Sequence, residues 1–157
     1  MPAAPQITEI TMLDIVRVFA DAGIVAACSV ADRDYVCFEQ SFLEREFSEG
    51  LRAFQWNLGI DRFEDEANDC DDFAADANFY ARLVHRRAAN RPAKRALAAG
   101  RLYCQLVPGD PKSNHAIDWF IVNTPAGLRL VTYEPQRQAV FGLSSAQRDT
   151  CFFWATP

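Results

Sequence analysis

Hydrophobic side chains recur at steps of three and four residues in three stretches of the first half of the chain. This spacing keeps side chains on one face of a helix and predicts helices at about residues 7–20, 41–57 and 70–89. Gly23 and Gly59 are typical stop signals, and Pro92 cannot continue the third helix. The third pattern is the longest and consists of Phe73, Ala77, Tyr80, Ala81, Val84 and Ala88.

The second half of the chain has short apolar runs separated by turn-forming residues. Strands are predicted at residues 102–107, 115–122, 128–134 and 139–143, with strand or loop structure at 24–28 and 35–38. Helices first and an antiparallel meander second is an α+β arrangement.

Composition and length narrow the class of protein. The 157 residues, half of them hydrophobic, predict a single domain over residues 1–157, with residues 1–6 as a loose N-terminal end. A net charge of −5 argues against general nucleic-acid binding, and no stretch is long enough to span a membrane. Without a recognisable signal peptide, the default location is cytoplasmic, with non-classical export left open. The oligomeric state is not encoded in any pattern here.

A cysteine opens the third predicted helix. Asn68 and Asp69 are good N-cap residues, so Cys70 would lie at or within one residue of the helix N-terminus. There the helix dipole favours negative charge, and a thiol ionises more easily to a nucleophilic thiolate. Nearby carboxylates oppose this effect. A calcium ion held by Asp71 and Asp72 would resolve the conflict; the alternative is that these acids only cap the helix.

A nucleophilic thiol needs an imidazole to accept its proton and a third group to orient that imidazole. His85 lies about four turns along the Cys70 helix, which leaves His115 as the candidate base. Glu134 ends the next predicted strand, and an even-numbered loop would place it directly across from His115. Asp118 is a weaker candidate, because it points to the opposite side of the strand from His115.

The other four cysteines form no paired spacing that would indicate a disulfide framework. They lie in apolar neighbourhoods, and we interpret them as packing residues: Cys28, Cys37, Cys104 and Cys151.

The order of these motifs resembles a known family. Asp69-Cys70-Asp71-Asp72-Phe73-Ala74, then Asn114-His115-Ala116, then Tyr133-Glu134-Pro135-Gln136, are similar to the C-terminal protease domain of fungal agglutinins related to the Marasmius oreades lectin. The resemblance covers roughly residues 35 to 143.

The resemblance implies a papain-like fold, with the nucleophile at a helix N-terminus packed on an antiparallel sheet. It implies a calcium-dependent cysteine protease in which Cys70 is the nucleophile, His115 the base and Glu134 the orienting acid. Asp71 and Asp72 would bind the calcium. The family's sugar-binding β-trefoil domain is absent from this sequence. The oxyanion donor is left open among three residues: Gln55, Trp56 and Asn57.

We therefore expect a papain-like cysteine hydrolase acting on a peptide or protein substrate. One alternative keeps the nucleophile but cleaves cell-wall amide bonds, as a bacterial or phage amidase or endopeptidase does. The other is a non-catalytic metal- or partner-binding module on the same fold, with an aromatic contact surface made of Trp119, Phe120, Phe152, Phe153 and Trp154.

Overall fold

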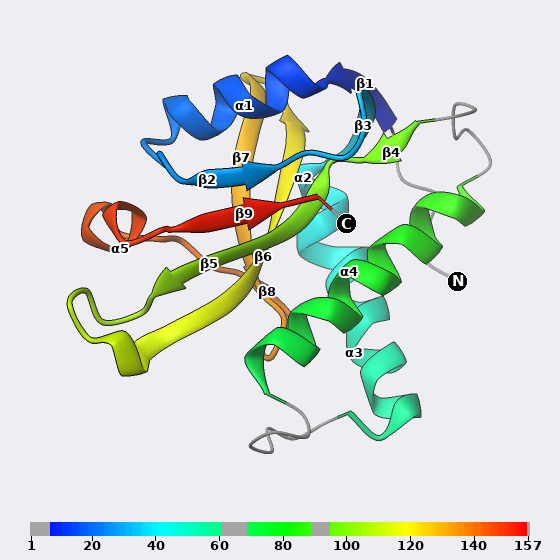
Figure 1. Ribbon diagram of the computed structural model, residues 1–157. Helices are drawn as coiled ribbons and strands as arrows, with labels where there is room; N and C mark the ends of the chain where they lie inside the picture. The colour runs from blue at the N-terminus through cyan, green and yellow to red at the C-terminus, as the bar shows by residue number, and fades with distance from the viewer. Residues whose placement is uncertain (1–6, 61–68, 89–94, 157) are drawn as a thin grey trace.

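The computed structural model describes residues 7–60, 69–88 and 95–156 (Figure 1). The expectations for residues 1–6, Asn68, Ala89 and Pro92 lie outside these ranges. In chain order the elements are β1 (Ile7–Thr11), α1 (Met12–Asp21), β2 (Ala27–Ser29), β3 (Asp34–Glu39), α2 (Gln40–Phe42), η1 (Leu43–Phe47), α3 (Ser48–Leu58), α4 (Cys70–Arg87), β4 (Ala96–Leu97), β5 (Ala99–Gln105), η2 (Pro111–Ser113), β6 (Asn114–Thr124), β7 (Gly127–Glu134), β8 (Ala139–Val140), α5 (Ser145–Asp149) and β9 (Phe153–Ala155).

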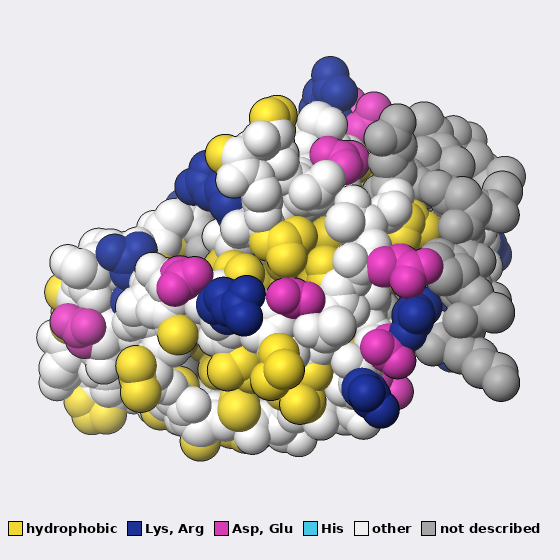
Figure 2. Space-filling model, turned by 90° about the horizontal axis from the view of Figure 1, so that it is seen from above, with side chains coloured by type: hydrophobic (Ala, Val, Ile, Leu, Met, Phe, Trp, Pro, Cys, Tyr) yellow, Lys and Arg dark blue, Asp and Glu magenta, His cyan; other side chains and the backbone are white. Residues whose placement is uncertain are grey.

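All the described strands belong to one curled, mixed sheet. Its main path runs β1-β3-β6-β5-β9-β2, while β4 pairs with β3, β7 with β6, and β8 with β7. Three of the pairings are parallel: β3 with β6, β3 with β4, and β2 with β9. Figure 1 shows α1 on one side of the sheet and α3 with α4 on another. Seen from the α1 side, the surface carries exposed hydrophobic side chains interspersed with charged ones (Figure 2).

The central strand β6 is buried on both faces. Trp119 packs with Phe19 of α1 and Trp154 of β9, at ring-centroid distances of 5.1 and 5.6 Å. The next residue, Phe120, lies on the opposite face and packs with aromatic rings of η1 and β7. Successive side chains of a strand alternate between its faces, so β6 contributes to two hydrophobic cores at once.

Helix α4 lies across β5 and β6, and α3 packs against it. Its apolar stripe is buried as the sequence predicted, with Phe73, Ala77 and Ala81 at most 3% exposed. The helix begins at Cys70, and Asp69 is the N-cap residue, as expected. It ends at Arg87, earlier than the predicted end near residue 89.

The predicted arrangement of helices followed by an antiparallel sheet is wrong. The stretch 7–20 is not one helix, because residues 7–11 pair antiparallel with β3 as strand β1. Thr11 then caps α1 in a reciprocal hydrogen-bonded capping box with Asp14. The sheet therefore starts at the beginning of the described chain and is mixed. Apolar residues that fit a helical period also fit a strand when tertiary pairing is available.

Gly100 marks a close approach of β5 to its neighbours. A Cβ atom here would collide with the carbonyl oxygen of Ala155 and lie 2.8 Å from the Trp119 ring. We expect Gly100→Ala to lower the free energy of unfolding by about 1–3 kcal/mol, because the core must shift to accommodate the methyl group. Urea unfolding measures this. Gly142→Ala is the control, since nothing lies within 4 Å of that position; equal stability of the two variants would contradict the close approach.

Candidate functional site

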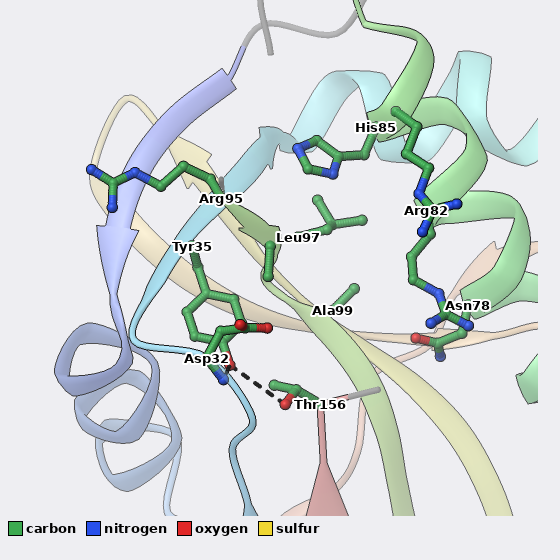
Figure 3. A pocket seen from close by; sticks show the side chains of 11 residues that line it. Asp32, Tyr35, Asn78, Arg82, His85, Arg95, Leu97, Ala99 and Thr156 are labelled. Atoms are coloured by element: carbon green, nitrogen blue, oxygen red, sulfur yellow. Dashed lines mark hydrogen bonds between the residues drawn. The ribbon is translucent and has the colours of Figure 1, made fainter. Parts of the chain in front are cut away.

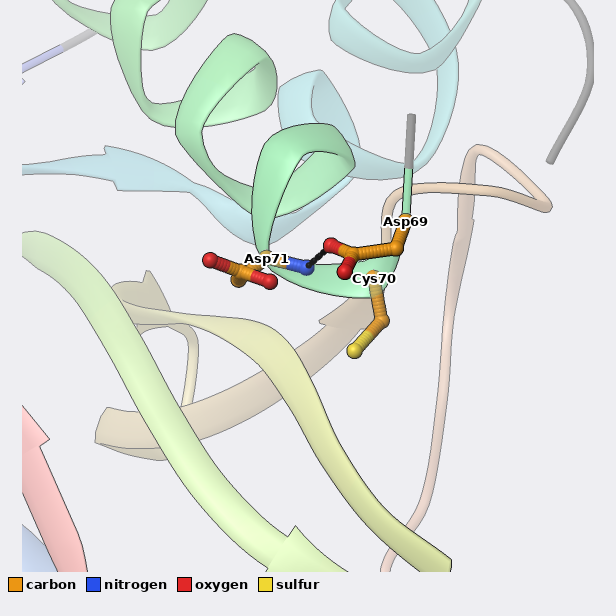
Figure 4. A group of neighbouring side chains, drawn as sticks. All are labelled: Asp69, Cys70 and Asp71. Atoms are coloured by element: carbon orange, nitrogen blue, oxygen red, sulfur yellow. Dashed lines mark hydrogen bonds between the residues drawn. The ribbon is translucent and has the colours of Figure 1, made fainter. Parts of the chain in front are cut away.

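The first turn of α4 presents the Cys70 thiol. The side chain of Asp69 accepts a hydrogen bond from the backbone N–H of Asp71 at 3.1 Å, which fixes the start of the helix. The Cys70 sulfur points away from this turn toward the strands, whereas the Asp69 and Asp71 carboxylates lie beside the helix start (Figure 4). Cys70 is partly exposed, so its thiol is open to a ligand.

His115, at the beginning of β6, is paired with Glu134, at the end of β7. His115 Nε2 lies 2.8 Å from Glu134 Oε2, and the two side chains are only 11% and 8% exposed. A carboxylate on one ring nitrogen leaves the other nitrogen available to a neighbour. The structure thus brings Cys70, His115 and Glu134 together, as the sequence analysis expected for these three residues.

The electrostatics of His115 follow from its two partners. Burial alone would lower the pKa of His115. Hydrogen bonds to Cys70 and Glu134, together with their negative charges, outweigh burial and raise that pKa to about 9. His115 is therefore a cation at neutral pH, held between a carboxylate and a sulfur atom.

The register between β6 and β7 differs from the prediction. Asp118 pairs with Tyr133, and continuing this register by one residue sets Glu134 opposite Ile117. His115 is therefore offset by two residues from a direct partner of Glu134. A two-residue offset keeps both side chains on the same face, whereas a one-residue offset would have separated them.

A hydrogen-bonded network extends from this pair to α3. Glu134 Oε1 accepts from the backbone N–H of Gln136 at 3.2 Å. Gln138 Nε2 donates to the Gln136 carbonyl and, at 2.8 Å, to Oε1 of Gln55. Gln138 has a positive φ of 47°, a conformation that tight loops require. Gln136 and Gln138 belong to no periodic pattern, and sequence reasoning missed their role in this network.

Gln55 is the buried residue among the three candidates for an oxyanion donor. It is 1% exposed, while Trp56 is 71% exposed and Asn57 is also on the surface. Its Nε2 group has no hydrogen-bond partner among the described residues. A buried N–H without a partner costs free energy that an acceptor on a ligand would recover.

Acidic side chains at the start of α4 are closely spaced. One ligand atom from each of Asp69, Cys70 and Asp71 lies within 4.8 Å of the others. A hydrogen bond in which the Asp71 carboxyl group donates to the Asp69 carboxylate, followed by burial and the Asp69 charge, raises the pKa of Asp71. Asp72 instead accepts a hydrogen bond from the Asp69 backbone at 3.3 Å and completes the capping box. The pair beside the thiol is therefore Asp69 and Asp71.

Asp118 lies on the α4 side of β6, away from the His115–Glu134 pair. It is fully buried, and burial raises its pKa well above the usual value for a carboxyl group. Asn78 of α4 donates a hydrogen bond to it. This placement agrees with the expectation that Asp118 points to the opposite side of the strand from His115.

Two other expectations need correction. Trp119, Phe120 and Trp154 are at most 3% exposed and belong to the cores, so the five aromatic residues do not form one contact surface. Cys28 is exposed because β2 lies at the end of the sheet path, whereas the interpretation as packing residues is confirmed for the buried Cys37, Cys104 and Cys151.

Comparison with solved structures identifies the fold. The chain is folded like half of a lectin. It superposes with a TM-score of 0.68 and 19% identity on a Polyporus squamosus lectin bound to the human-type influenza-binding epitope Neu5Acα2-6Galβ1-4GlcNAc. It superposes with a TM-score of 0.65 and 15% identity on a chain described as the PSL1a–E64 complex. The similarity covers 94% of this chain and 49% and 51% of the two others.

This likeness, at 15% and 19% identity, concerns the fold alone. The chain spans about half the length of each lectin chain, and neither description says which half touches the ligand. No protein-family model matches the sequence, and no curated protein matches it. Among residues 7–60, 69–88 and 95–156, no helix combines the length and apolar character needed to cross a membrane.

The comparison corrects the predicted identity. The predicted membership in a family of papain-like, calcium-dependent cysteine protease domains is wrong, because the fold is one shared with a lectin. The prediction of a cysteine hydrolase, whether peptidase or cell-wall amidase, is corrected on the same finding, and with it the peptide or protein substrate. The inference failed because the order and spacing of Cys70, His115 and Glu134 predict only that these three residues lie together. The fold is decided by the arrangement of the strands around them.

The charge on His115 gives a direct test. In the native chain we expect His115 to lose its proton near pH 9, and in Glu134→Gln at a clearly lower pH, because the hydrogen bond and the charge of the carboxylate no longer oppose burial. The His115–Glu134 pair contributes its whole share of the free energy of unfolding below pH 6.5, about the pKa of histidine in the unfolded chain. This contribution is lost as the pH rises through the pKa of His115 in the folded chain.

NMR titration of the histidine ring protons measures this change. The chain has only one other histidine, so His85→Gln leaves a single titrating signal in both backgrounds. An unchanged His115 titration in Glu134→Gln would contradict the ion pair.

Proposed function

We propose that this chain is a ligand-binding module and that one ligand site is formed by Cys70, His115 and Glu134. The lectin-like fold supports the proposal. So do the descriptions of the two structural neighbours, one bound to a sialylated glycan and the other in complex with the compound E64. The observation that carries it is the cationic His115 held between a carboxylate and a partly exposed thiol.

The groups around the thiol define the ligand chemistry. A protonated imidazole donates hydrogen bonds, and Gln55 offers a buried amide donor at the α3 end of the network that runs from Glu134 through Gln136 and Gln138. Such donors suit a ligand that carries a carbonyl or carboxylate oxygen. The sulfur supplies a soft contact at the same place. E64 is the first probe, because a structural neighbour is described as its complex.

Alkylation of Cys70 by iodoacetamide reports on the state of the thiol. At pH 7 we expect Cys70 to react about tenfold faster than the exposed Cys28, because a hydrogen-bonded imidazole activates a neighbouring thiol as a nucleophile. His115→Ala should remove the difference. Peptide mass spectrometry measures both rates in one sample, with Cys28 as the internal control.

E64 then tests the site itself. If E64 binds at this cluster, it protects Cys70 from alkylation and leaves the rate at Cys28 unchanged. Equal alkylation of Cys70 with and without E64 would contradict the site. Turnover of casein by the native chain, lost in Cys70→Ser, would contradict the proposal that the chain only binds.

A second proposal is that calcium binds at the start of α4. The specific observation is the Asp69–Asp71 pair, in which one carboxyl group hydrogen-bonds the other and the pKa of Asp71 is raised. A divalent cation would replace that shared proton. Calcium takes six to eight oxygen ligands, and two carboxylates supply few of them, so waters would complete the shell and the affinity would be weak, on the order of millimolar.

Melting temperatures in 5–10 mM calcium, roughly that affinity range, test this site. We expect the native chain to be stabilised by calcium and Asp71→Asn to lose the effect, because RT ln(1 + [L]/Kd) vanishes when binding is lost. Asp149→Asn, an exposed acid in α5, is the matched control and should keep the response. A calcium effect of equal size in Asp71→Asn would argue against this pair, whether Asp72 contributes or not.

A further inference from the structure

A second pocket lies beside the carboxyl-terminal half of α4. Its volume is about 260 Å³, and its walls come from α4, the start of β3, the residues around β4 and the C-terminal strand (Figure 3). Arg82 is twelve residues beyond Cys70, or about 18 Å along the helix at 1.5 Å per residue. The pocket is therefore separate from the thiol site.

Two arginines form the cationic side of this pocket. Arg82 and Arg86 are four residues apart, so they lie on one face of α4. Within the described parts of the chain, neither makes an ion pair or hydrogen bond. Arg95 also lines the pocket, but its charge is balanced by Asp34 at 2.7 Å and Glu9 at 3.3 Å. Two guanidinium groups are thus available to an anion.

The opposite side carries oxygen atoms. Asp32 is exposed, and its backbone N–H donates to the Tyr35 hydroxyl at 2.8 Å. The Tyr35 hydroxyl donates to Thr156 Oγ1 at 3.4 Å. Thr156 Oγ1 also accepts a hydrogen bond from the backbone N–H of Ala31. These bonds fix the wall, while the Asp32 carboxylate is left facing the pocket as an acceptor (Figure 3). Leu97 and Ala99 form an apolar floor between the two sides.

Asn78 adds a second, buried acceptor. It is 4% exposed, lines the pocket, and has no hydrogen-bond partner for its Oδ1 atom among the described residues. Its Nδ2 group is used by Asp118 and by the carbonyl of Ala74. An unpaired buried acceptor costs about 1–3 kcal/mol, which a ligand hydroxyl could recover.

We infer that this pocket binds an acidic sugar, with its carboxylate on Arg82 and Arg86 and its hydroxyl groups on Asp32 and Asn78. Guanidinium groups bind carboxylates with paired hydrogen bonds, and carboxylate and amide oxygens accept from hydroxyls. A simple phosphate fits less well, because it has no hydroxyl groups remote from its own charge and the Asp32 carboxylate repels it. The volume suits one sugar ring rather than a longer chain. The inference rests on the proposed binding function but concerns a different site.

Free N-acetylneuraminic acid is the probe, and NMR titration of the native chain at low salt is the measurement. We expect saturable shifts in α4 residues around Arg82. The double variant Arg82→Gln with Arg86→Gln should weaken binding at least about tenfold, which equals about 1.4 kcal/mol. Arg87→Gln is the matched control: it is the next exposed arginine on α4 but does not line the pocket. Asp32→Asn should weaken binding of the sugar, which loses a hydroxyl acceptor, without abolishing binding of its carboxylate by the arginines.

Each contrary result is specific. The inference would be overturned if the double variant bound N-acetylneuraminic acid with unchanged affinity. It would also be overturned if the native chain showed no saturable shifts in up to about 50 mM of the sugar. Equal binding of galactose would show that the carboxylate is not recognised, and equal binding of inorganic phosphate would show a general anion site; both overturn it. Cys70→Ser should bind the sugar normally, so failure of the thiol-site proposal is distinguishable from failure here.

Discussion

The burial of β6 on both faces is the constraint on which the other elements depend. A strand with a core on each side must present apolar residues at nearly every position, and β6 does so from Ala116 to Val122 except at Asp118. Trp119 and Phe120 each organise an aromatic group on opposite faces. Once that strand is fixed, α1 must cover one face and α4 the other, and each polar side chain of β6 has a determined direction.

The thiol cluster follows from this determined direction. His115 lies on the same face of the sheet as Glu134 because their offset from direct pairing is two residues, an even number. Asp118, three positions further along, must face α4, where burial raises the pKa of its carboxyl group and Asn78 donates a hydrogen bond to it. The two acids on the two faces of the sheet thus have different roles. Glu134 supports a cation, whereas Asp118 fills a polar gap beneath a helix.

Local features of the sequence were predictable, and long-range pairings were not. The cap, start and buried stripe of α4 depend on neighbouring residues, so they could be inferred from Asp69 through Ala81. The same holds for β6, β7 and the shared face of His115 and Glu134. The strand β1 could not be inferred, because its pairing with β3 is a tertiary contact that overrides a helical period. The parallel pairing of β3 with β6, which helps to make the sheet mixed, could not be inferred from the sequence either.

Helix α4 carries opposite charges at its two ends. Its first turn carries Asp71 and Asp72 and its last turn carries Arg86 and Arg87, an arrangement that complements the helix dipole. The same placement produces two different surfaces about four turns apart. The amino end combines acids with a thiol, whereas Arg82 and Arg86 form a cationic surface farther along the helix. Because the helix is rigidly packed on β5 and β6, one element holds both surfaces at a fixed separation. A ligand at one end would therefore leave the other end open to a second ligand.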